Sequence, residues 1–170
     1  MSGMEALGRL LDVGHVWTPQ DFHTSGVTGA WVSLKRASGV LFVVQFAKGT
    51  SGDNATLTLQ EATTFAGAGN QNLAVIDHWY LKANATPTSD LTGAEVWVQE
   101  TQAAAATVVA TAADYQLIAI EVLAEQLDAG YSYVNLSAGS TSAAQIASCL
   151  AIPHDLLVQR APANLLALSI

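Results

Sequence analysis

The stretch Thr56-Leu57-Thr58-Leu59-Gln60 alternates polar and apolar residues more strictly than any other part of the chain. In an extended strand successive side chains point to opposite faces, so the two leucines would face a core while the three polar residues face solvent. A loop rich in Gly, Ser, Asp and Asn, residues 49–54, precedes the stretch. Together these features predict a half-buried strand of an antiparallel sheet.

Seven further segments on either side of this stretch combine apolar alternation or β-branched and aromatic residues with turn-forming boundaries. Ser38-Gly39 separates the first two of them and predicts a hairpin. Eight short strands with little helix predict an all-β fold, a two-sheet β-sandwich for which a jelly roll is one strand order that fits. The predicted strands are residues 30–36, 40–46, 56–60, 73–82, 95–101, 115–123, 131–137 and 144–152.

Residues 102–127 admit two interpretations. The run Ala103 to Ala106 and the segment 121–127 have a helix-forming composition. Against a helix, the β-branched residues within 115–123 suit a pleated sheet better. We therefore expect a strand over 115–123, whereas the alanine run remains open between loop, strand and short helix.

Both ends of the chain differ from the middle, which predicts a division into an N-terminal arm (1–27), a sandwich domain (28–153) and an apolar C-terminal tail (154–170). Apolar residues between Met4 and Leu11 fall at helical spacing, and Pro19 would end any helix there. We therefore expect extended or helical terminal segments around one β-sandwich.

The apolar ends have two interpretations. Residues 161–170 carry no charged side chain, and an apolar terminus that is left unpacked favours association with other chains. Termini that fold back on their own domain are equally common, so this alternative stays open. Under the first interpretation the expected partner-binding residues are Leu7, Leu10, Leu11, Trp17, Leu165, Leu166, Leu168 and Ile170.

Composition restricts the class of protein. With 170 residues, 51% hydrophobic and 12% charged, the chain fits one globular domain and not a disordered chain. It has no apolar run long enough to cross a bilayer and no secretory signal, so we expect a protein that stays in the cytoplasm where it is made. A net charge of −8 with six dispersed basic residues argues against nucleic acid as a partner.

Residues that carry chemistry are few. Cys149 is the only cysteine and is expected to be a small buried apolar residue. Asp77 and His78 are neighbours in a predicted strand and should point to opposite faces, and the loop around Asp53 has a single carboxylate where calcium sites recruit several. No catalytic or nucleotide-binding motif occurs. The sequence predicts a protein that is not an enzyme and that uses no cofactor or metal.

The large aromatic residues have two interpretations. They can pack in the core or across strands, which is the usual place of large aromatics in sandwiches. They can also form an exposed row that stacks on sugar rings, which would indicate a carbohydrate-binding or host-receptor-binding module. The residues concerned are Trp31, Trp79, Trp97, Tyr80, Tyr131 and Tyr133.

Several motifs resemble a family of small structural proteins of tailed bacteriophages, and the resemblance covers most of residues 12–152. One departure is the segment Pro153-His154-Asp155 with the leucine-rich tail, which replaces a tyrosine-rich end of the family. The motifs are Gly29-Ala30-Trp31-Val32-Ser33-Leu34-Lys35, Gly52-Asp53 leading to Thr56-Leu57-Thr58-Leu59-Gln60-Glu61-Ala62, Trp97-Val98-Gln99-Glu100-Thr101, and Tyr133-Val134-Asn135-Leu136 with Ala144-Gln145-Ile146.

This resemblance implies a virion protein, of the capsid decoration or minor head type, that binds and stabilises the head shell. Its expected partners are the major capsid protein or other virion subunits. Because virions are built from many copies, a homo-oligomer is also expected. The family has no catalytic motif, so no functional residue is carried over.

Overall fold

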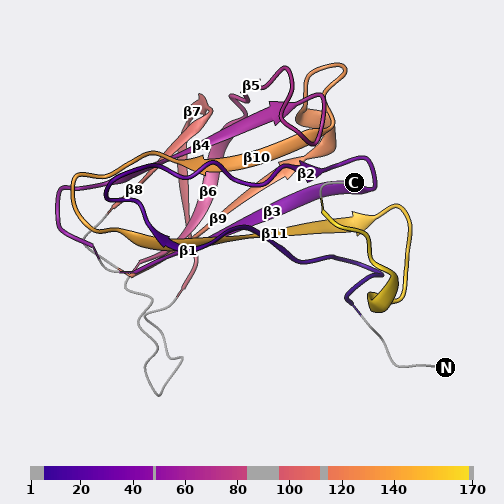
Figure 1. The fold of residues 1–170 in the computed structure, drawn as a ribbon, viewed down its shortest axis with the longest axis horizontal. Coiled ribbons are helices and arrows are strands. Elements are labelled where there is room, and N and C mark those ends of the chain that lie inside the picture. The colour runs from indigo at the N-terminus through magenta and orange to yellow at the C-terminus, as the bar shows by residue number, and fades with distance from the viewer. Residues whose placement is uncertain (1–5, 48, 84–95, 112–114, 169–170) are drawn as a thin grey trace.

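The computed structural model describes residues 6–47, 49–83, 96–111 and 115–168, and the regular structure in these ranges is almost entirely strand. Two antiparallel sheets form two layers, with β4 and β10 in one layer and β1, β3 and β11 in the other (Figure 1). This confirms the predicted all-β sandwich. Sheet A has the order β1 (Gly14–Asp21), β11 (Ile146–Leu156), β3 (Ala37–Phe46), β9 (Gln116–Leu123), β6 (Ile76–Ala83) and β7 (Val98–Ala105).

Sheet B is smaller, and its central strand β4 has two short neighbours on the side away from β10. Its order is β2 (Val32–Ser33), β10 (Tyr133–Ala138), β4 (Ala55–Ala62) and β5 (Gln71–Asn72), with β8 (Thr107–Ala110) also paired to β4. When β5 and β8 are counted as halves of one strand, and β6 and β7 as an insertion between them, eight strands remain. Numbered 1 to 8 along the chain, they follow the order 1-8-3-6 in sheet A (β1, β11, β3, β9) and 2-7-4-5 in sheet B (β2, β10, β4, and β5 with β8). This is the strand order of a jelly roll.

The core lies between the two sheets and is formed by the inward faces of their strands. Leu57 and Leu59 of β4 are fully buried, as their alternation predicted, and Leu59 pairs with Leu136 of β10. From sheet A, Phe42 of β3 and Ile120 of β9 enter the same cluster in register with each other. Each such buried side chain contributes about 1.5–3 kcal/mol to folding, so the alternating residues hold the two layers together.

The predicted hairpin around Ser38-Gly39 is wrong. β2 belongs to sheet B, where it pairs with β10, whereas β3 belongs to sheet A, where it pairs with β11 and β9. The chain changes sheets between them, with a turn at Lys35 and Arg36, and both Ser38 and Gly39 lie within β3. Gly39 has a packing role instead, because a Cβ there would lie 2.7 Å from Nε2 of His154.

Strands also occupy the region for which a helix was the alternative. β7 contains residues 103–105 of the alanine run, and β8 and β9 follow. The only helical element in the described part of this region is a single 3-10 turn, η1 (Ala124–Gln126). The β-branched residues of 115–123 therefore predicted the strand correctly.

The terminal ranges contain more of the sandwich than the sequence suggested. Residues 8–10 form a turn instead of a helix, and β1 lies within the range assigned to an arm, paired with β11 at the edge of sheet A. Pro19 is compatible with this position, because an edge strand tolerates the loss of one donor. At the other end β11 continues to Leu156, past the expected boundary at residue 153.

Candidate docking site at the chain ends

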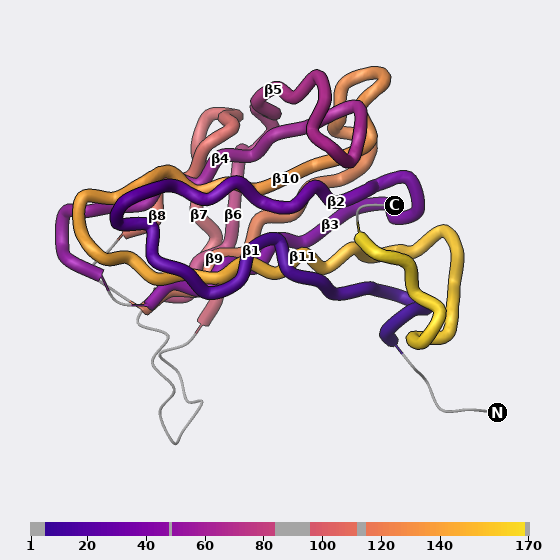
Figure 2. The backbone as a smooth tube through the Cα atoms, viewed as in Figure 1, coloured from indigo at the N-terminus to yellow at the C-terminus, as the bar shows by residue number. Residues whose placement is uncertain are grey.

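The two terminal segments meet at one end of the sandwich, where their tubes run close together (Figure 2). The amide of Gly8 donates to the carbonyl of Leu11 at 2.7 Å and closes the N-terminal turn. The amide of Arg160 donates to the carbonyl of Gly8 at 2.8 Å, and that of Asp12 donates to the carbonyl of Pro153 at 2.9 Å. The leucines expected on separate ends therefore lie on two segments that meet, and we call them together the terminal cluster: Leu7, Leu10, Leu11, Leu165, Leu166 and Leu168.

The C-terminal segment folds back on its own sandwich through the 3-10 turn η2 (Pro162–Asn164). The amide of Ser33 in β2 donates to the carbonyl of Leu168 at 2.7 Å, and the Leu168 side chain packs against the core. A Cβ on Gly14 would lie 2.3 Å from Cδ1 of Leu168, so this glycine allows the close approach. The fold-back interpretation therefore describes the tail as far as Leu168.

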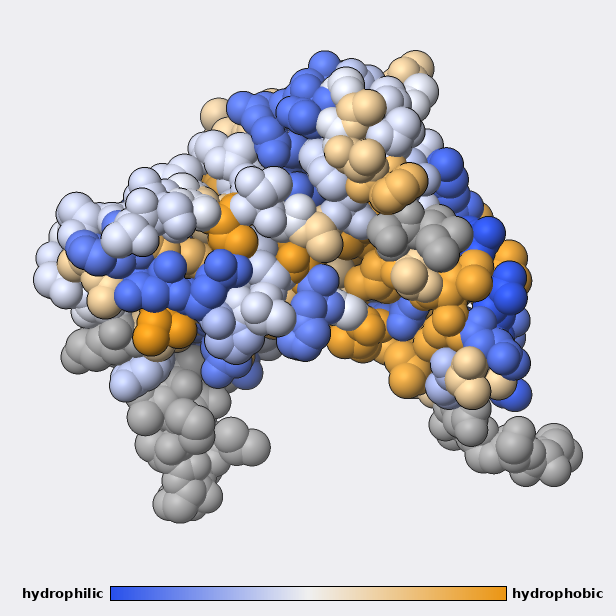
Figure 3. All heavy atoms as spheres, viewed as in Figure 1, coloured by the Kyte–Doolittle hydropathy of each residue, from blue (hydrophilic) through white to orange (hydrophobic). Residues whose placement is uncertain are grey.

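Folding back leaves part of the terminal cluster exposed. Leu10 is 61% exposed, Leu7 40% and Leu166 36%, whereas Leu11, Leu165 and Leu168 are half-buried. Figure 3 shows hydrophobic residues gathered at this end of the molecule with hydrophilic residues at the rim. The remaining expected contact residue on this tail, Ile170, lies outside the described residues.

Trp17 does not join the terminal cluster. It is 4% exposed because β1 directs it into the core, where its ring packs edge-on against Phe22 at 6.2 Å between ring centres. Phe22 in turn packs edge-on against Phe46 of β3. The expectation of a partner contact at Trp17 is therefore replaced by a structural role, namely holding the edge strand β1 on the sandwich.

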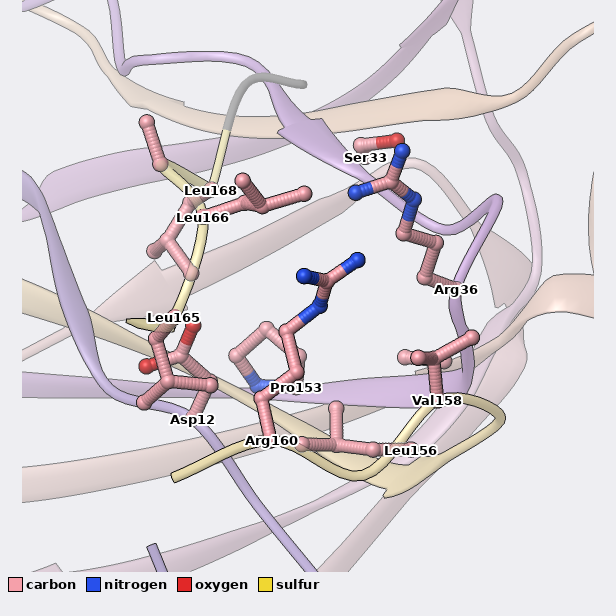
Figure 4. A pocket seen from close by; sticks show the side chains of 12 residues that line it. Asp12, Ser33, Arg36, Pro153, Leu156, Val158, Arg160, Leu165, Leu166 and Leu168 are labelled. Carbon is pink, nitrogen blue, oxygen red and sulfur yellow. The ribbon is translucent and has the colours of Figure 1, made fainter. Parts of the chain in front are cut away.

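Two arginines flank the terminal cluster and line a cavity of about 60 Å³ beneath the C-terminal segment (Figure 4). The guanidinium group of Arg160 extends into the middle of this space, and that of Arg36 lies beside Ser33. Within the described ranges neither arginine forms an ion pair, although acidic residues far outnumber basic ones in the chain. Sequence analysis missed both, because Arg36 and Arg160 are distant in sequence and only the fold brings them to one cavity.

Two of the six large aromatics are exposed, Tyr80 on β6 and Trp97 directly before β7. Tyr80 is 39% and Trp97 45% exposed, and the Lys82 ammonium lies 5.0 Å from the centre of the Trp97 ring. Trp79, by contrast, packs against the core, and Tyr133 is buried. The core interpretation therefore applies to Trp79 and Tyr133, and a surface role is left to Tyr80 and Trp97.

The carboxylate of Asp53, the only acid of the glycine-rich loop, clamps two loops together. It accepts hydrogen bonds from the amide of Ser142 at 2.9 Å and from the amide of Ala143. These donors occupy both carboxylate oxygens, which gives the residue a structural role. Within the described ranges no three His, Cys, Asp or Glu side chains gather as a metal site would require.

Two histidines pair with carboxylates on the outside of sheet A. His78 and Asp77 are hydrogen-bonded to each other, which lowers the pKa of Asp77, and a register shift in β6 at this point explains why the expectation of opposite faces was wrong. His154 Nδ1 lies 2.9 Å from Asp155, and its Nε2 lies 3.0 Å from Glu121 without hydrogen-bond geometry. Neither pairing contains a hydroxyl or thiol that a base would activate.

No protein-family model, curated protein or solved structure matches the chain. No helix in the described ranges has the length and apolar character needed to span a membrane. Interpretation of the site therefore depends on its own geometry.

Proposed function

We propose that this chain is a structural subunit of a tailed-bacteriophage virion, a capsid decoration protein that binds the major capsid protein through the terminal cluster. The resemblance over residues 12–152 supports this proposal. The jelly-roll strand order supports it by analogy only, because this fold builds viral capsid domains and lectin domains alike. The proposal places the protein in the virion after synthesis in the host cytoplasm.

The observation that carries the proposal is the partly exposed terminal cluster beside two arginines that form no ion pair with any residue the structure describes. Leu7, Leu10 and Leu166 offer apolar contact area, and Arg36 and Arg160 offer charge at its rim. Protein interfaces typically combine an apolar centre with a polar rim, and arginine is enriched in them. A capsid segment with a carboxylate next to apolar side chains has the chemistry that fits this surface.

The rigidity of the terminal cluster favours docking. Its two segments are hydrogen-bonded to each other and to β11 and β2, so binding orders few additional residues. On a shell, many copies would bind at once, and modest individual contacts would then stabilise the whole particle.

The test uses virions purified from the phage that encodes the chain, and empty shells prepared from them. The exposed leucines are changed in the double variant Leu10→Asp and Leu166→Asp, which should weaken cosedimentation with shells by about tenfold or more, because charge replaces apolar contact area. Val109→Asp, 56% exposed on β8, is the control and should bind like the wild type. Absence of the chain from virions, or full binding of the double variant, would contradict the proposal.

A second function has one observation in its favour. Tyr80 on β6 and Trp97 directly before β7 are exposed, and exposed aromatic faces can stack on sugar rings. This alternative is a carbohydrate-binding or host-receptor-binding module of the virion. A glycan array should then give hits that Trp97→Ala abolishes and that the terminal-cluster double variant retains; an array without hits rejects this function.

A further inference from the structure

The outer face of sheet A is apolar over three adjacent strands. The inward side chains of these strands form the core, so their alternate residues point outward, and those in the middle of the strands are aliphatic as well. They are half-buried, except for Ala119, which is buried, and polar residues such as Gln45 and Ser148 flank them. Strand pairing makes them contiguous, since Leu41 pairs with Ile152 and Val43 pairs with both Leu150 and Ala119. Strands that are apolar on both faces are typical of sheets that are covered on both sides. The aliphatic centre of the outer face consists of Leu41 and Val43 of β3, Leu117 and Ala119 of β9, and Leu150 and Ile152 of β11.

Sheet B provides an internal comparison. Its outward residues on β4 are Thr56, Thr58 and Gln60, and its neighbour β10 contributes Ser137 beside Thr58. This is the polar face expected of an antiparallel sheet against solvent. Because both sheets come from the same chain, the aliphatic centre of the outer face of sheet A is a difference that a macromolecular neighbour would explain.

The inserted ribbon extends this face beyond the jelly roll. Tyr80 of β6 pairs with Ala119, and Lys82 pairs with Leu117, so both continue the rows of β9. Four strands about 4.8 Å apart and the five residues of about 3.4 Å each from the Lys82 row to the Glu121 row cover roughly 330 Å² in projection. A stable interface buries roughly 800 Å² per partner, so the contact must also involve side-chain area and the edge strands β1 and β7.

The charged groups of the face lie on opposite sides of its centre, with Lys82 on one side and Glu121, which lies 3.0 Å from Nε2 of His154, on the other. The central row is Leu150, Val43, Ala119 and Tyr80. The row that contains Lys82 lies two residues from the central row in one strand direction. The row that contains Glu121 lies two residues from it in the opposite direction. The face is therefore complementary to a copy of itself turned end to end.

We propose that this face binds the same face of a second copy, about a twofold axis that runs across the strands along the central row. Such an axis reverses the strand direction, so the Lys82 row of one copy lies over the Glu121 row of the other, and the apolar central rows meet. An isologous contact of this kind is the commonest route to a homodimer. The inference deepens the proposed function by naming a partner, but it uses a different surface from the terminal cluster.

The first test is sedimentation equilibrium of the purified full chain. The wild type should be a dimer at micromolar concentration. Val43→Glu places a charge in the centre of the contact and should raise the dimer dissociation constant by about a hundredfold or more. Thr58→Glu, at a half-buried strand position on the outer face of sheet B, is the matched control and should leave the dissociation constant unchanged.

The second test addresses the orientation of the two copies. Lys82→Glu and Glu121→Lys should each weaken the dimer by about three- to tenfold, because each places like charges opposite one another. The double variant, with both substitutions in one chain, should restore the wild-type dissociation constant. Additive weakening in the double variant would overturn the twofold arrangement.

Several results would overturn the second copy as the occupant. One is a wild-type chain that remains monomeric at about 100 µM, roughly a hundredfold above the micromolar concentration at which we expect the dimer. Another is a dimer that Val43→Glu leaves intact and that the terminal-cluster double variant breaks. A monomer whose shell binding is lost through Val43→Glu would assign the face to a capsid protein. Dimerisation is measured without shells, so the two proposals can fail separately. The chain can bind shells through the terminal cluster without forming the dimer, and it can form the dimer without binding shells.

Discussion

Cys149 shows how a single buried side chain loses its chemistry. It lies fully buried in β11 between the sheets, and burial raises the pKa of its thiol because the charged thiolate is poorly solvated there. Since the thiolate is the reactive form, the folded chain should resist alkylation by iodoacetamide at pH 8. Mass spectrometry should detect quantitative labelling only after unfolding in guanidinium; rapid labelling of the native chain would contradict the buried position.

Asp21 links the end of β1 to the segment before β11. Its carboxylate accepts the amides of Gln145 at 2.9 Å and His23 at 3.0 Å, and these bonds, that of Gln145 first, hold the pKa of Asp21 below its ordinary value of 3.8. A carboxyl whose pKa is lower in the folded than in the unfolded chain stabilises the fold above the unfolded pKa. This contribution is lost as the pH falls through the folded pKa.

Asp21→Asn should therefore be less stable than the wild type at pH 7, and the difference should shrink as the pH falls from about 4 toward 2. Urea unfolding at the two ends of this range measures it. Glu125→Gln, an exposed carboxyl on η1, is the control and should change stability little at either pH. A deficit in Asp21→Asn that is constant with pH would contradict the role of the ionised carboxylate.

The edge strand β1 depends on one large side chain. Trp17→Ala removes the ring that packs on Phe22 and should lower the free energy of unfolding by about 3–5 kcal/mol. Leu10→Ala, which truncates an exposed side chain a few residues earlier, should change it by less than about 0.5 kcal/mol. Urea denaturation followed by circular dichroism measures both, and equal small effects would place β1 off the sandwich.

The strands were predictable where one face is buried, and the connections between them were not. Alternation in β4 and the β-branched residues of β9 indicate extended structure, because these signals depend only on neighbouring residues in the sequence. The change of sheet between β2 and β3 leaves no such local pattern, since it depends on β10 and β11 pairing with them from the far end of the chain. β5 was also missed, because two paired residues show no periodicity.

For the molecule as a whole, the sequence indicated apolar ends but not their meeting point. The leucines of the terminal cluster were predicted as contact residues of two separate ends. The hydrogen bonds between the terminal segments, which the sequence does not show, bring both ends to one place. The strand order joins residues that are distant in sequence. Only the structure therefore shows that Arg36 and Arg160 line one cavity and that aliphatic residues of three strands meet on the outer face of sheet A. The two proposals therefore depend on the jelly-roll arrangement as much as on composition.

A reconstruction of the virion tests the central claim, that this sandwich docks to a capsid shell through the terminal cluster. We expect density for the jelly roll on the shell surface, with Leu10 and Leu166 toward the major capsid protein. The outer face of sheet A should lie against a second copy. Virions without this density, or with the terminal cluster facing solvent, would contradict the account.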